Sequence, residues 1–411
     1  MILTNHAQEV FDRGSAIRDM FLLAKKFRST GKNPIDLSLG NPDIKPPVEY
    51  YHALRDIVDS AHQSELNSHG YIPSVGLPAT RTRVAADLAD KFGLNFTSGN
   101  VIITAGAANA LDVLLMTLIE PDTNPKDEVI VIAPFFVEYN SYTENNKGKL
   151  VVVNSDEDTF DLDLDAIAEA ITPRTRALII NSPHNPTGKV YSSEKLAELA
   201  EVLRSKNQEY GITIACLEDS PYSLVVFGGR EFASILPHYQ YGIHVNSFSK
   251  SLGVAGERIG YLAVHPELGT TAEINEFMTV AATNLRTKLV NAPALQQRVI
   301  TEIGCYTTGD LQPYEQRVNR LAKTLSQQGF EFPRPEGAFY LFAELPLEFD
   351  TMQEFTEYAH RGNDPLIFTP GAAFGGEKYA HHLRFSACVS SDEIERACDK
   401  IERICAERRA A

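Results

Sequence analysis

The stretch Asn246-Ser-Phe-Ser-Lys-Ser-Leu-Gly-Val-Ala-Gly-Glu-Arg-Ile-Gly260 places one lysine among small residues just beyond a predicted strand. A lysine in such a place can lose its water and have a depressed pKa, and a neutral amine can form a Schiff base with an aldehyde. Ser247 and Arg258 flank Lys250 with a hydroxyl and a guanidinium, which can hold a phosphate carried by that same aldehyde. Pyridoxal phosphate carries both groups. The residues Ser247-Phe-Ser-Lys250 also fit a strand end with an exposed lysine. The rest of the chain must therefore distinguish a cofactor site from an ordinary strand end.

The composition is that of a globular protein with an acidic balance. A chain of 411 residues exceeds the usual size of one compact core, so we expect a large domain and a smaller one. Hydrophobic residues at 43% and charged residues at 22% argue against disorder. The formal charge of 38 − 54 = −16 argues against nucleic acid or an anionic membrane as a partner. Any anionic ligand must therefore be met by local positive groups.

The cysteines and the first residues favour a reducing compartment. The five cysteines are an odd number without a CxxC pair, which is typical of buried thiols and not of a disulfide framework or a zinc site. Residues 1–30 carry scattered charges and no continuous apolar segment with a cleavage site, so we expect no signal peptide. No run is long and apolar enough to span a bilayer. A cytoplasmic location is the simplest expectation.

From residue 100 onward, short β-branched runs alternate with helical patterns. Each run is continuously apolar or β-favouring, which predicts strands buried on both faces and hence an α/β domain with a mostly parallel sheet. Ligands of such sheets bind at the carboxyl ends of the strands. The predicted strands are 101–104, 129–133, 177–180, 212–217, 244–247 and 259–264, and two of the predicted helices lie at 107–118 and after Ser192.

The flanking segments predict a smaller α+β layer. We expect an amphipathic helix over 15–30, a short strand from Ile35 that ends in a turn at Gly40, and a long helix from Pro293 to Arg320. Further strands are predicted within 336–342, 366–369 and 382–386, before a last helix whose apolar face is Ile394, Ala397, Cys398, Ile401, Ile404 and Cys405. The expected division is residues 51–294 for the large domain, and 1–50 with 295–411 for the small one.

Polar clusters follow several of the predicted strands. The amides of Gly106, Ala107 and Ala108 lie at a predicted helix N-terminus, where a phosphate is favoured. Asn181-Ser-Pro-His-Asn-Pro-Thr-Gly188 follows the third strand, and Leu217-Glu-Asp-Ser-Pro-Tyr222 follows the fourth. Taken singly, these are a helix start, a turn and a helix cap. Their occurrence together and in this order favours a ligand site.

In these motifs the sequence resembles the aspartate aminotransferase family, class I and II aminotransferases of fold type I that use pyridoxal phosphate. The resemblance runs from about Ile35 to about Ser386. It implies a large domain with a mostly parallel seven-stranded sheet and a smaller α+β domain. The matching motifs are Leu39-Gly-Asn-Pro-Asp43, Tyr71 with Gly76, Gly106-Ala-Ala108, Pro134-Phe-Phe136, Asn185-Pro-Thr-Gly188, Asp219-Ser-Pro-Tyr222, Ser247-Phe-Ser-Lys250, Gly256-Glu-Arg258 and Leu383-Arg384.

The resemblance implies a role for each matching residue. Lys250 would form the internal aldimine and carry the proton during transamination. Asp219 would pair with the pyridinium nitrogen, which makes the ring an electron sink. Asn185 and Tyr222 would hydrogen-bond the phenolate oxygen, and Phe136 would stack on the ring. The phosphate would be held by Ser247, Ser249, Arg258 and the Gly106-Ala107-Ala108 loop, with Tyr71 reaching in from the partner of a homodimer. The substrate carboxylate would be bound by Arg384, with Asn185 and the Gly40 backbone nearby.

The sequence departs from the family pattern at three places. The phosphate loop has alanines where many members have a hydroxyl residue, so its backbone amides must contribute more. Asp219-Ser-Pro-Tyr222 replaces the more common Asp-Glu-x-Tyr but keeps the two functional residues. Arg286 is a weak counterpart of the arginine that recognises a dicarboxylate in some members, and it fits a solvated helix residue as well.

We therefore expect an aminotransferase that moves an amino group from an L-amino acid to a 2-oxo acid, with 2-oxoglutarate as the expected acceptor, by a ping-pong reaction. A lyase for β-elimination or carbon–sulfur cleavage would share all the cofactor residues. A catalytically idle sensor module is disfavoured because Lys250 and Asp219 are both present. No metal is expected, since adjacent histidines such as His381 and His382 point to opposite faces of a strand. The amino donor is not specified by any motif.

Overall fold

The computed structural model describes residues 16–63, 69–121 and 125–411, and it contains a seven-stranded sheet in the order β2-β8-β7-β6-β5-β3-β4. Strand β8 is antiparallel to both of its neighbours, and the other strands share one direction. This confirms the predicted α/β class and the mostly parallel sheet. The strands are β2 (Val101–Thr104), β3 (Glu128–Ala133), β4 (Lys149–Asn154), β5 (Thr175–Asn181), β6 (Ala215–Asp219), β7 (Gly242–Ser247) and β8 (Gly260–Val264).

Helices cover both faces of this sheet because alternate strand residues point to opposite sides. Ile102 and Leu262 pack with helices α5 (Ala107–Leu118) and α10 (Thr271–Leu289) in one apolar cluster. Ile103 and Tyr261, their neighbours along the strands, pack with α4 (Pro78–Phe92) and α11 (Ala294–Ile303) in another. Further helices of this part are α3 (Val48–Gln63), α6 (Glu138–Asn145), α7 (Leu164–Ala170), α8 (Ser193–Tyr210) and α9 (Phe248–Ser251), with short 3-10 turns at Ser98–Asn100 and Ala255–Glu257.

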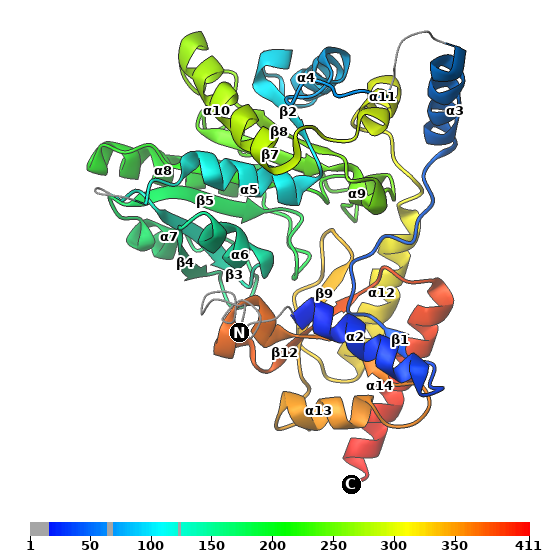
Figure 1. Ribbon diagram of the computed structural model, residues 1–411. Helices are drawn as coiled ribbons and strands as arrows, with labels where there is room; N and C mark the ends of the chain where they lie inside the picture. The colour runs from blue at the N-terminus through cyan, green and yellow to red at the C-terminus, as the bar shows by residue number, and fades with distance from the viewer. Residues whose placement is uncertain (1–15, 64–68, 122–124) are drawn as a thin grey trace, which may run out of the picture.

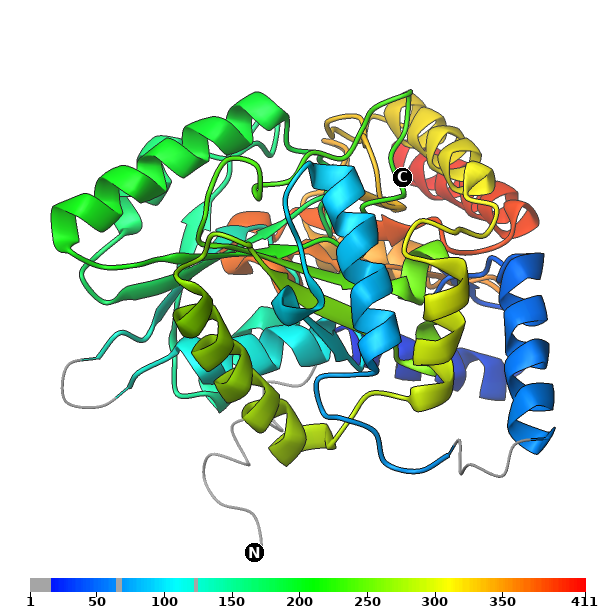
Figure 2. The same ribbon diagram turned by 90° about the horizontal axis from the view of Figure 1, so that it is seen from above.

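The smaller layer lies below the large sheet in Figure 1. Strand β1 (Ile35–Asp36) pairs with β10 (Leu366–Ile367), and β11 (Thr369–Pro370), β12 (His382–Ser386) and β9 (Tyr340–Glu344) form an antiparallel sheet. The predicted apolar face of the last helix is buried, as are all five cysteines, which are free. The helices of this layer are α2 (Ala16–Ser29), α12 (Gln312–Gln327), α13 (Met352–Ala359) and α14 (Ser391–Arg409), with 3-10 turns at Gly371–Phe374 and Gly376–Tyr379. In the view from above, α3 stands at the rim beside α11 (Figure 2).

Several predicted elements differ from the structure. The single helix from Pro293 to Arg320 is wrong, because the chain breaks into α11 and α12 after Gly304, whose φ of 76° leaves the helical region. Strand β4 was not predicted; it is an edge strand and is largely exposed on one side. The predicted strand 336–342 begins later, at Tyr340, because the preceding residues cross to the large sheet. The domain boundaries near residues 50 and 295 stay a prediction.

No helix among the described residues has the length and apolarity needed to cross a membrane.

The residues that lead into β9 are fastened to the large sheet through the main chain. The carbonyl of Gly188 accepts hydrogen bonds from the amides of Glu336 at 2.9 Å and Gly337 at 3.0 Å. The Phe227 amide donates to the Glu336 carbonyl at 2.8 Å. The loop after β5, the loop after β6 and the start of β9 are thereby held in one fixed arrangement.

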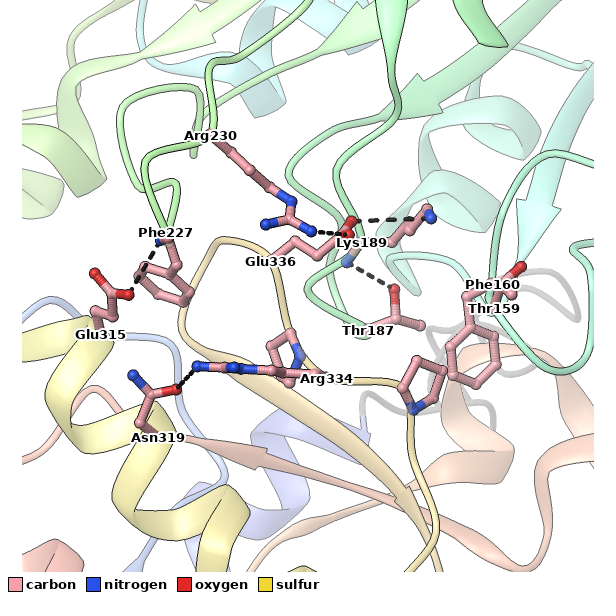
Figure 3. A pocket seen from close by; sticks show the side chains of 13 residues that line it. Thr159, Phe160, Thr187, Lys189, Phe227, Arg230, Glu315, Asn319, Arg334 and Glu336 are labelled. Carbon is pink, nitrogen blue, oxygen red and sulfur yellow. Dashed lines mark hydrogen bonds and ion pairs between the residues drawn. The ribbon is translucent and has the colours of Figure 1, made fainter.

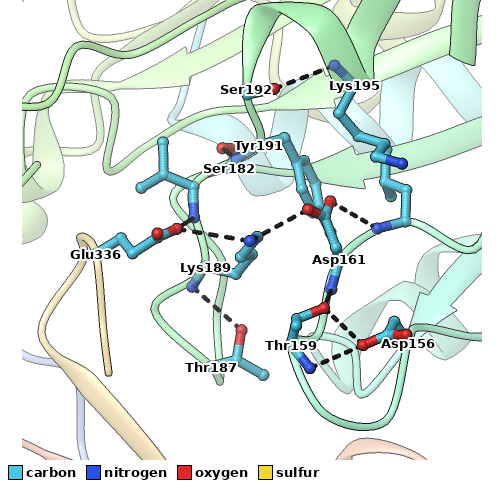
Figure 4. A network of polar contacts seen from close by, with 12 residues as sticks. Asp156, Thr159, Asp161, Ser182, Thr187, Lys189, Tyr191, Ser192, Lys195 and Glu336 are labelled. Atoms are coloured by element: carbon cyan, nitrogen blue, oxygen red, sulfur yellow. Dashed lines mark hydrogen bonds and ion pairs between the residues drawn. The ribbon is translucent and has the colours of Figure 1, made fainter. Parts of the chain in front are cut away.

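The Glu336 side chain strengthens this junction. Its carboxylate accepts from Arg230 Nη2 at 3.0 Å (Figure 3). It also accepts from the Val190 amide at 3.1 Å and lies 3.8 Å from Lys189 Nζ (Figure 4). Lys189 also pairs with Asp161 at 3.2 Å. A cavity of about 510 Å³ opens beside these residues, between α12 and the loops of the large sheet (Figure 3). We call the contacts of Glu336 with Gly188, Val190, Lys189 and Arg230 the Glu336 clamp.

Candidate active site

A cavity of about 290 Å³ lies where strands β5, β6 and β7 end, between the large sheet and the smaller layer. The structure brings almost all of the predicted site residues together here, and of these candidates only Gly106, Tyr71 and the weak candidate Arg286 do not line the cavity. The lining residues are Gly40, Ala107, Ala108, Leu111, Phe136, Tyr142, Asn181, Asn185, Asp219, Pro221, Tyr222, Ser247, Ser249, Lys250, Ala255, Arg258, Tyr340 and Arg384. Asn181, Asp219 and Ser247 are the last residues of β5, β6 and β7, as expected for a ligand site of a parallel sheet.

Lys250 lies in the short helix α9, directly after β7. Its Nζ donates a hydrogen bond of 2.6 Å to the Gly40 carbonyl. Burial lowers the pKa of Lys250 to about 8, and the positive charges of Arg384 and Arg258 act in the same direction. About one tenth of the amine is therefore neutral at pH 7, far more than for an exposed lysine, and the neutral amine is the form that attacks a carbonyl carbon.

Asp219 is the last residue of β6, and its carboxylate is only half satisfied. The Tyr139 hydroxyl donates to Oδ2 at 2.6 Å, whereas Oδ1 has no hydrogen-bond partner among the described residues. Asn181 Nδ2 donates to the Asp219 carbonyl at 2.7 Å and fixes the strand end. Burial raises the pKa of Asp219 to about 6, against the effect of the Tyr139 hydrogen bond. A buried oxygen without a partner in a ligand-sized cavity suits a cationic nitrogen of a bound ring.

Arg384, on β12, lies at the other side of the cavity and is 1% exposed. Its Nη1 donates to Asn185 Oδ1 at 2.9 Å, and its Nη2 donates to the Ser38 carbonyl at 2.6 Å. The guanidinium carbon lies 4.5 Å from the ring centre of Tyr340 and 4.8 Å from that of Phe374. Among the described residues, this buried guanidinium donates only to neutral oxygens, and no carboxylate accepts a hydrogen bond from it. A substrate carboxylate would supply that charge.

A third group of residues in the cavity, Ser247, Ser249 and Arg258 beside the N-terminus of α5, can bind an anion. Ser247 Oγ lies 2.7 Å from Ser249 Oγ and accepts from the Ser249 amide at 3.1 Å. Arg258 donates from Nη2 to the Ala105 carbonyl at 3.0 Å, beside the N-terminus of α5. A Cβ on Gly106 would lie 2.9 Å from that same Nη2, so only glycine leaves the arginine its place. Two hydroxyls, a guanidinium and helix amides are the groups that hold a phosphate.

The remaining predicted residues lie as follows. Phe136 lines the cavity and meets the Tyr139 ring edge-on at 5.7 Å between ring centres. Tyr71 is 91% exposed, away from the cavity of its own chain. Arg286 is exposed on α10 and does not line the cavity. Among the residues that the structure describes, no cluster of His, Cys, Asp or Glu could hold a metal ion.

Sequence reasoning missed Tyr142, which lines the cavity, and two tyrosines that contact predicted site residues. Tyr139 follows the quoted motif Pro134-Phe-Phe136 by three residues, and Tyr340 belongs to a segment that was interpreted only as a strand. Neither has a motif of its own. Only their contacts in the fold show that they belong to the site. The Tyr139 hydroxyl contacts the Asp219 carboxylate, and the Tyr340 hydroxyl lies 2.9 Å from the Tyr222 hydroxyl.

The fold and the cavity together define a class of enzyme. A lysine with a lowered pKa, a buried carboxylate with one open oxygen and an anion cradle surround one cavity at the strand ends, which is the arrangement that a fold type I pyridoxal-phosphate enzyme needs.

The comparisons with known proteins identify the family. Residues 32–401 match the model of the family "Aminotransferase class I and II". The chain is 31% identical to the probable aspartate aminotransferase of Methanocaldococcus jannaschii over 95% of its length and 96% of that protein. It is 30% identical to the aspartate aminotransferase of Bacillus subtilis over 92% of its length and 93% of that protein. The chain therefore belongs to the class I and II aminotransferases.

Solved structures agree with this assignment. An aminotransferase from Eubacterium rectale has a TM-score of 0.89 and 31% identity, with 99% of each chain covered. The aspartate aminotransferase of Thermotoga maritima has a TM-score of 0.84 at 25% identity, with 98% of this chain and 100% of that chain covered. The whole described fold is thus the fold of a transaminase.

Proposed function

We propose that this transaminase binds pyridoxal phosphate covalently at Lys250 and moves an amino group from an L-amino acid to 2-oxoglutarate by a ping-pong reaction. Members of the family use this cofactor, and the observation that carries the assignment is the common cavity of Lys250 and Asp219. The amine of one and the open oxygen of the other line the same 290 Å³ space. Burial lowers the pKa of Lys250, which favours the reactive neutral amine, and raises the pKa of Asp219, which makes its charge unfavourable until a cationic nitrogen lies beside it.

When bound, pyridoxal phosphate supplies a reactive carbonyl and an electron-withdrawing ring. Asp219 would hold a proton on the ring nitrogen, because its Oδ1 is buried and accepts no hydrogen bond from the described residues. Asn185 and Tyr222 orient the ring through its phenolate oxygen. Lys250 Nζ would hold the cofactor and, once the substrate amine has taken its place there, would be free to move the proton that leaves the Cα atom of the donor. The Gly40 carbonyl, which accepts from Nζ at 2.6 Å, keeps the amine directed into the cavity.

The substrate is held by its α-carboxylate. Arg384 offers a planar fork, and its contacts with Asn185 and the Ser38 carbonyl fix the plane of that fork. Stacking on the Tyr340 ring at 4.5 Å supports it from one side. Because every amino acid carries an α-carboxylate, this part of the site binds donor and acceptor alike.

We also propose a homodimer with shared sites in the cytoplasm. Tyr71 has a hydroxyl and a ring that are 91% exposed in the single chain, which suits contact with the phosphate site of a second copy. Five free and buried thiols suit a reducing compartment. Sedimentation of the protein with bound cofactor should give twice the chain mass of 45.4 kDa, and Tyr71→Ala should weaken cofactor binding without unfolding the chain.

The central test is chemical trapping followed by half-reactions. Borohydride reduction and peptide mapping should place a pyridoxyl group on Lys250, and a label on another lysine would contradict the proposal. Lys250→Ala is the control that should take no label. An amino acid panel with 2-oxoglutarate should then yield glutamate. Release of pyruvate and ammonia without any added 2-oxo acid would instead identify a lyase.

A further inference from the structure

Tyr340 contacts three functional groups of the site. Its hydroxyl lies 2.9 Å from the Tyr222 hydroxyl, and its ring lies 4.5 Å below the Arg384 guanidinium. A Cβ on Gly40 would overlap the Tyr340 hydroxyl, so this hydroxyl lies directly against the backbone that accepts the Lys250 amine. The position therefore joins the lysine, the expected ring site and the carboxylate site.

The structure fixes Tyr340 relative to Tyr222 through a short backbone path. The Val225 amide donates to the Tyr222 carbonyl at 2.7 Å, and the Ala338 amide donates to the Val225 carbonyl at 2.8 Å. The Glu336 clamp holds the residues immediately before Ala338 on the large sheet (Figures 3 and 4). The two tyrosine side chains are buried, and their rings meet edge-on at 5.6 Å between centres. Their hydroxyl pair is thus a fixed part of the site and not a chance contact of mobile side chains.

The direction of the hydrogen bond between the two hydroxyls follows from counting protons. Each phenol carries one proton, and burial raises the pKa of Tyr340 to about 12 and that of Tyr222 well above its ordinary value, so both are protonated at neutral pH. Tyr222 directs its single proton to the ring oxygen when the cofactor is bound. Between the two hydroxyls, only Tyr340 then has a proton left to donate.

We propose that Tyr340 is a positioning residue that donates its hydroxyl proton to the Tyr222 oxygen and so strengthens the hydrogen bond from Tyr222 to the cofactor. A hydroxyl that accepts a hydrogen bond becomes a better donor, because the bonds of a chain polarise one another. The stronger bond to the phenolate oxygen lowers the pH at which the Lys250–cofactor linkage loses its proton. This inference rests on the proposed function, since it requires the cofactor to be attached at Lys250.

The test is a double-mutant cycle on the protein with bound pyridoxal phosphate. The variants are Tyr222→Phe, Tyr340→Phe and the two together, and each keeps an aromatic ring at both positions. The readout is the midpoint of the pH-dependent absorbance change of the bound cofactor, measured without substrate. Cooperative strengthening of about 10–30% in a charge-assisted hydrogen bond predicts that Tyr340→Phe raises the midpoint by about 0.2 to 0.6 pH unit. Tyr222→Phe should raise it further.

The double-mutant cycle distinguishes an effect of Tyr340 that passes through Tyr222 from a general change in packing. If Tyr340 acts through Tyr222, Tyr340→Phe shifts the midpoint in the unsubstituted protein and has no effect in the Tyr222→Phe background. An equal shift in both backgrounds, or none in either, would overturn the inference. Thermal melting of each variant without cofactor reports any loss of packing independently. If the unsubstituted protein shows no pH-dependent band and no label at Lys250, the proposed function itself fails, and the inference with it.

Discussion

Replacing Asp219 by asparagine should stabilise the protein without cofactor and at the same time abolish most of its activity. Burial holds the pKa of Asp219 at about 6, against the ordinary value of 3.8. Since the folded state has the higher pKa, it binds more protons than the unfolded state between these two values. The ionised carboxylate therefore destabilises the fold at a pH above about 6, and this effect fades as the pH falls toward 4.

The expected size follows from the same two values. One pKa unit corresponds to 1.36 kcal/mol, so the ionised Asp219 carboxylate destabilises the fold by about 3 kcal/mol at pH 8. Asparagine can still accept from the Tyr139 hydroxyl, but its NH₂ group needs a partner in the cavity, which offsets about 1 kcal/mol or more. We expect Asp219→Asn to raise the free energy of unfolding by about 1 to 2 kcal/mol at pH 8.

Urea unfolding of the protein without cofactor, at pH 8 and at pH 5, measures this effect. The gain at pH 8 should shrink at pH 5, and the exposed Asp350→Asn should show no gain at either pH. With cofactor bound, the same Asp219→Asn variant should keep its label at Lys250 but lose several orders of magnitude in transamination rate, since a neutral amide no longer holds the proton on the ring nitrogen. A variant that is less stable at pH 8, or one with near-normal turnover, would refute the reasoning.

Three further changes test other contacts of the cavity. Arg384→Lys should lower kcat/KM by about ten- to a hundredfold for all donors alike, because a point charge replaces a fork that binds an α-carboxylate; a loss confined to acidic donors would mean that Arg384 reads the side chain. Gly40→Ala should abolish turnover, because the new Cβ overlaps the Tyr340 hydroxyl and moves the carbonyl that accepts from Lys250, and adding Tyr340→Phe should restore part of the rate if that overlap is the cause. Lys250→Met should stabilise the protein without cofactor at pH 7 by up to about 3 kcal/mol. The folded-state pKa of Lys250 is about 8, against 10.5 for an ordinary lysine, so the charged amine is unfavourable in the fold. This gain in stability should vanish as the pH rises from 8 toward 10.5, and a gain independent of pH would contradict this origin.

The sequence was most informative where one strand determines both the fold and a functional residue. The runs that end at Asn181, Asp219 and Ser247 are apolar, β-branched and short, so they indicate parallel strands, and a parallel sheet brings their carboxyl ends to one edge. Polar residues at those ends must then be neighbours. The cavity was predictable for this reason, even though its residues are spread over most of the chain.

What could not be predicted depends on contacts between segments far apart in sequence. The Tyr139 hydroxyl reaches a carboxylate 80 residues away, and that of Tyr340 reaches a hydroxyl 118 residues away. No local periodicity encodes such pairs, because they depend on how the smaller layer sits on the large sheet. The wrong helix from Pro293 to Arg320 has a similar origin. A glycine such as Gly304 can lie within a helix or end one, and only the backbone shows the positive φ that ends α11 there.

The pKa shifts of Lys250 and Asp219 have the same physical cause. Burial makes the charged form of Lys250 and the charged form of Asp219 unfavourable, so each group destabilises the empty protein near neutral pH. A ligand that reacts with the Lys250 amine and places a positive nitrogen beside Oδ1 of Asp219 removes the free-energy cost of both buried charges. Anything that binds only the folded state stabilises it, and here that gain adds to the relief of two buried groups. The same residues that weaken the empty fold thereby make the occupied site selective, because a ligand with only one of the two features relieves only one of the two penalties.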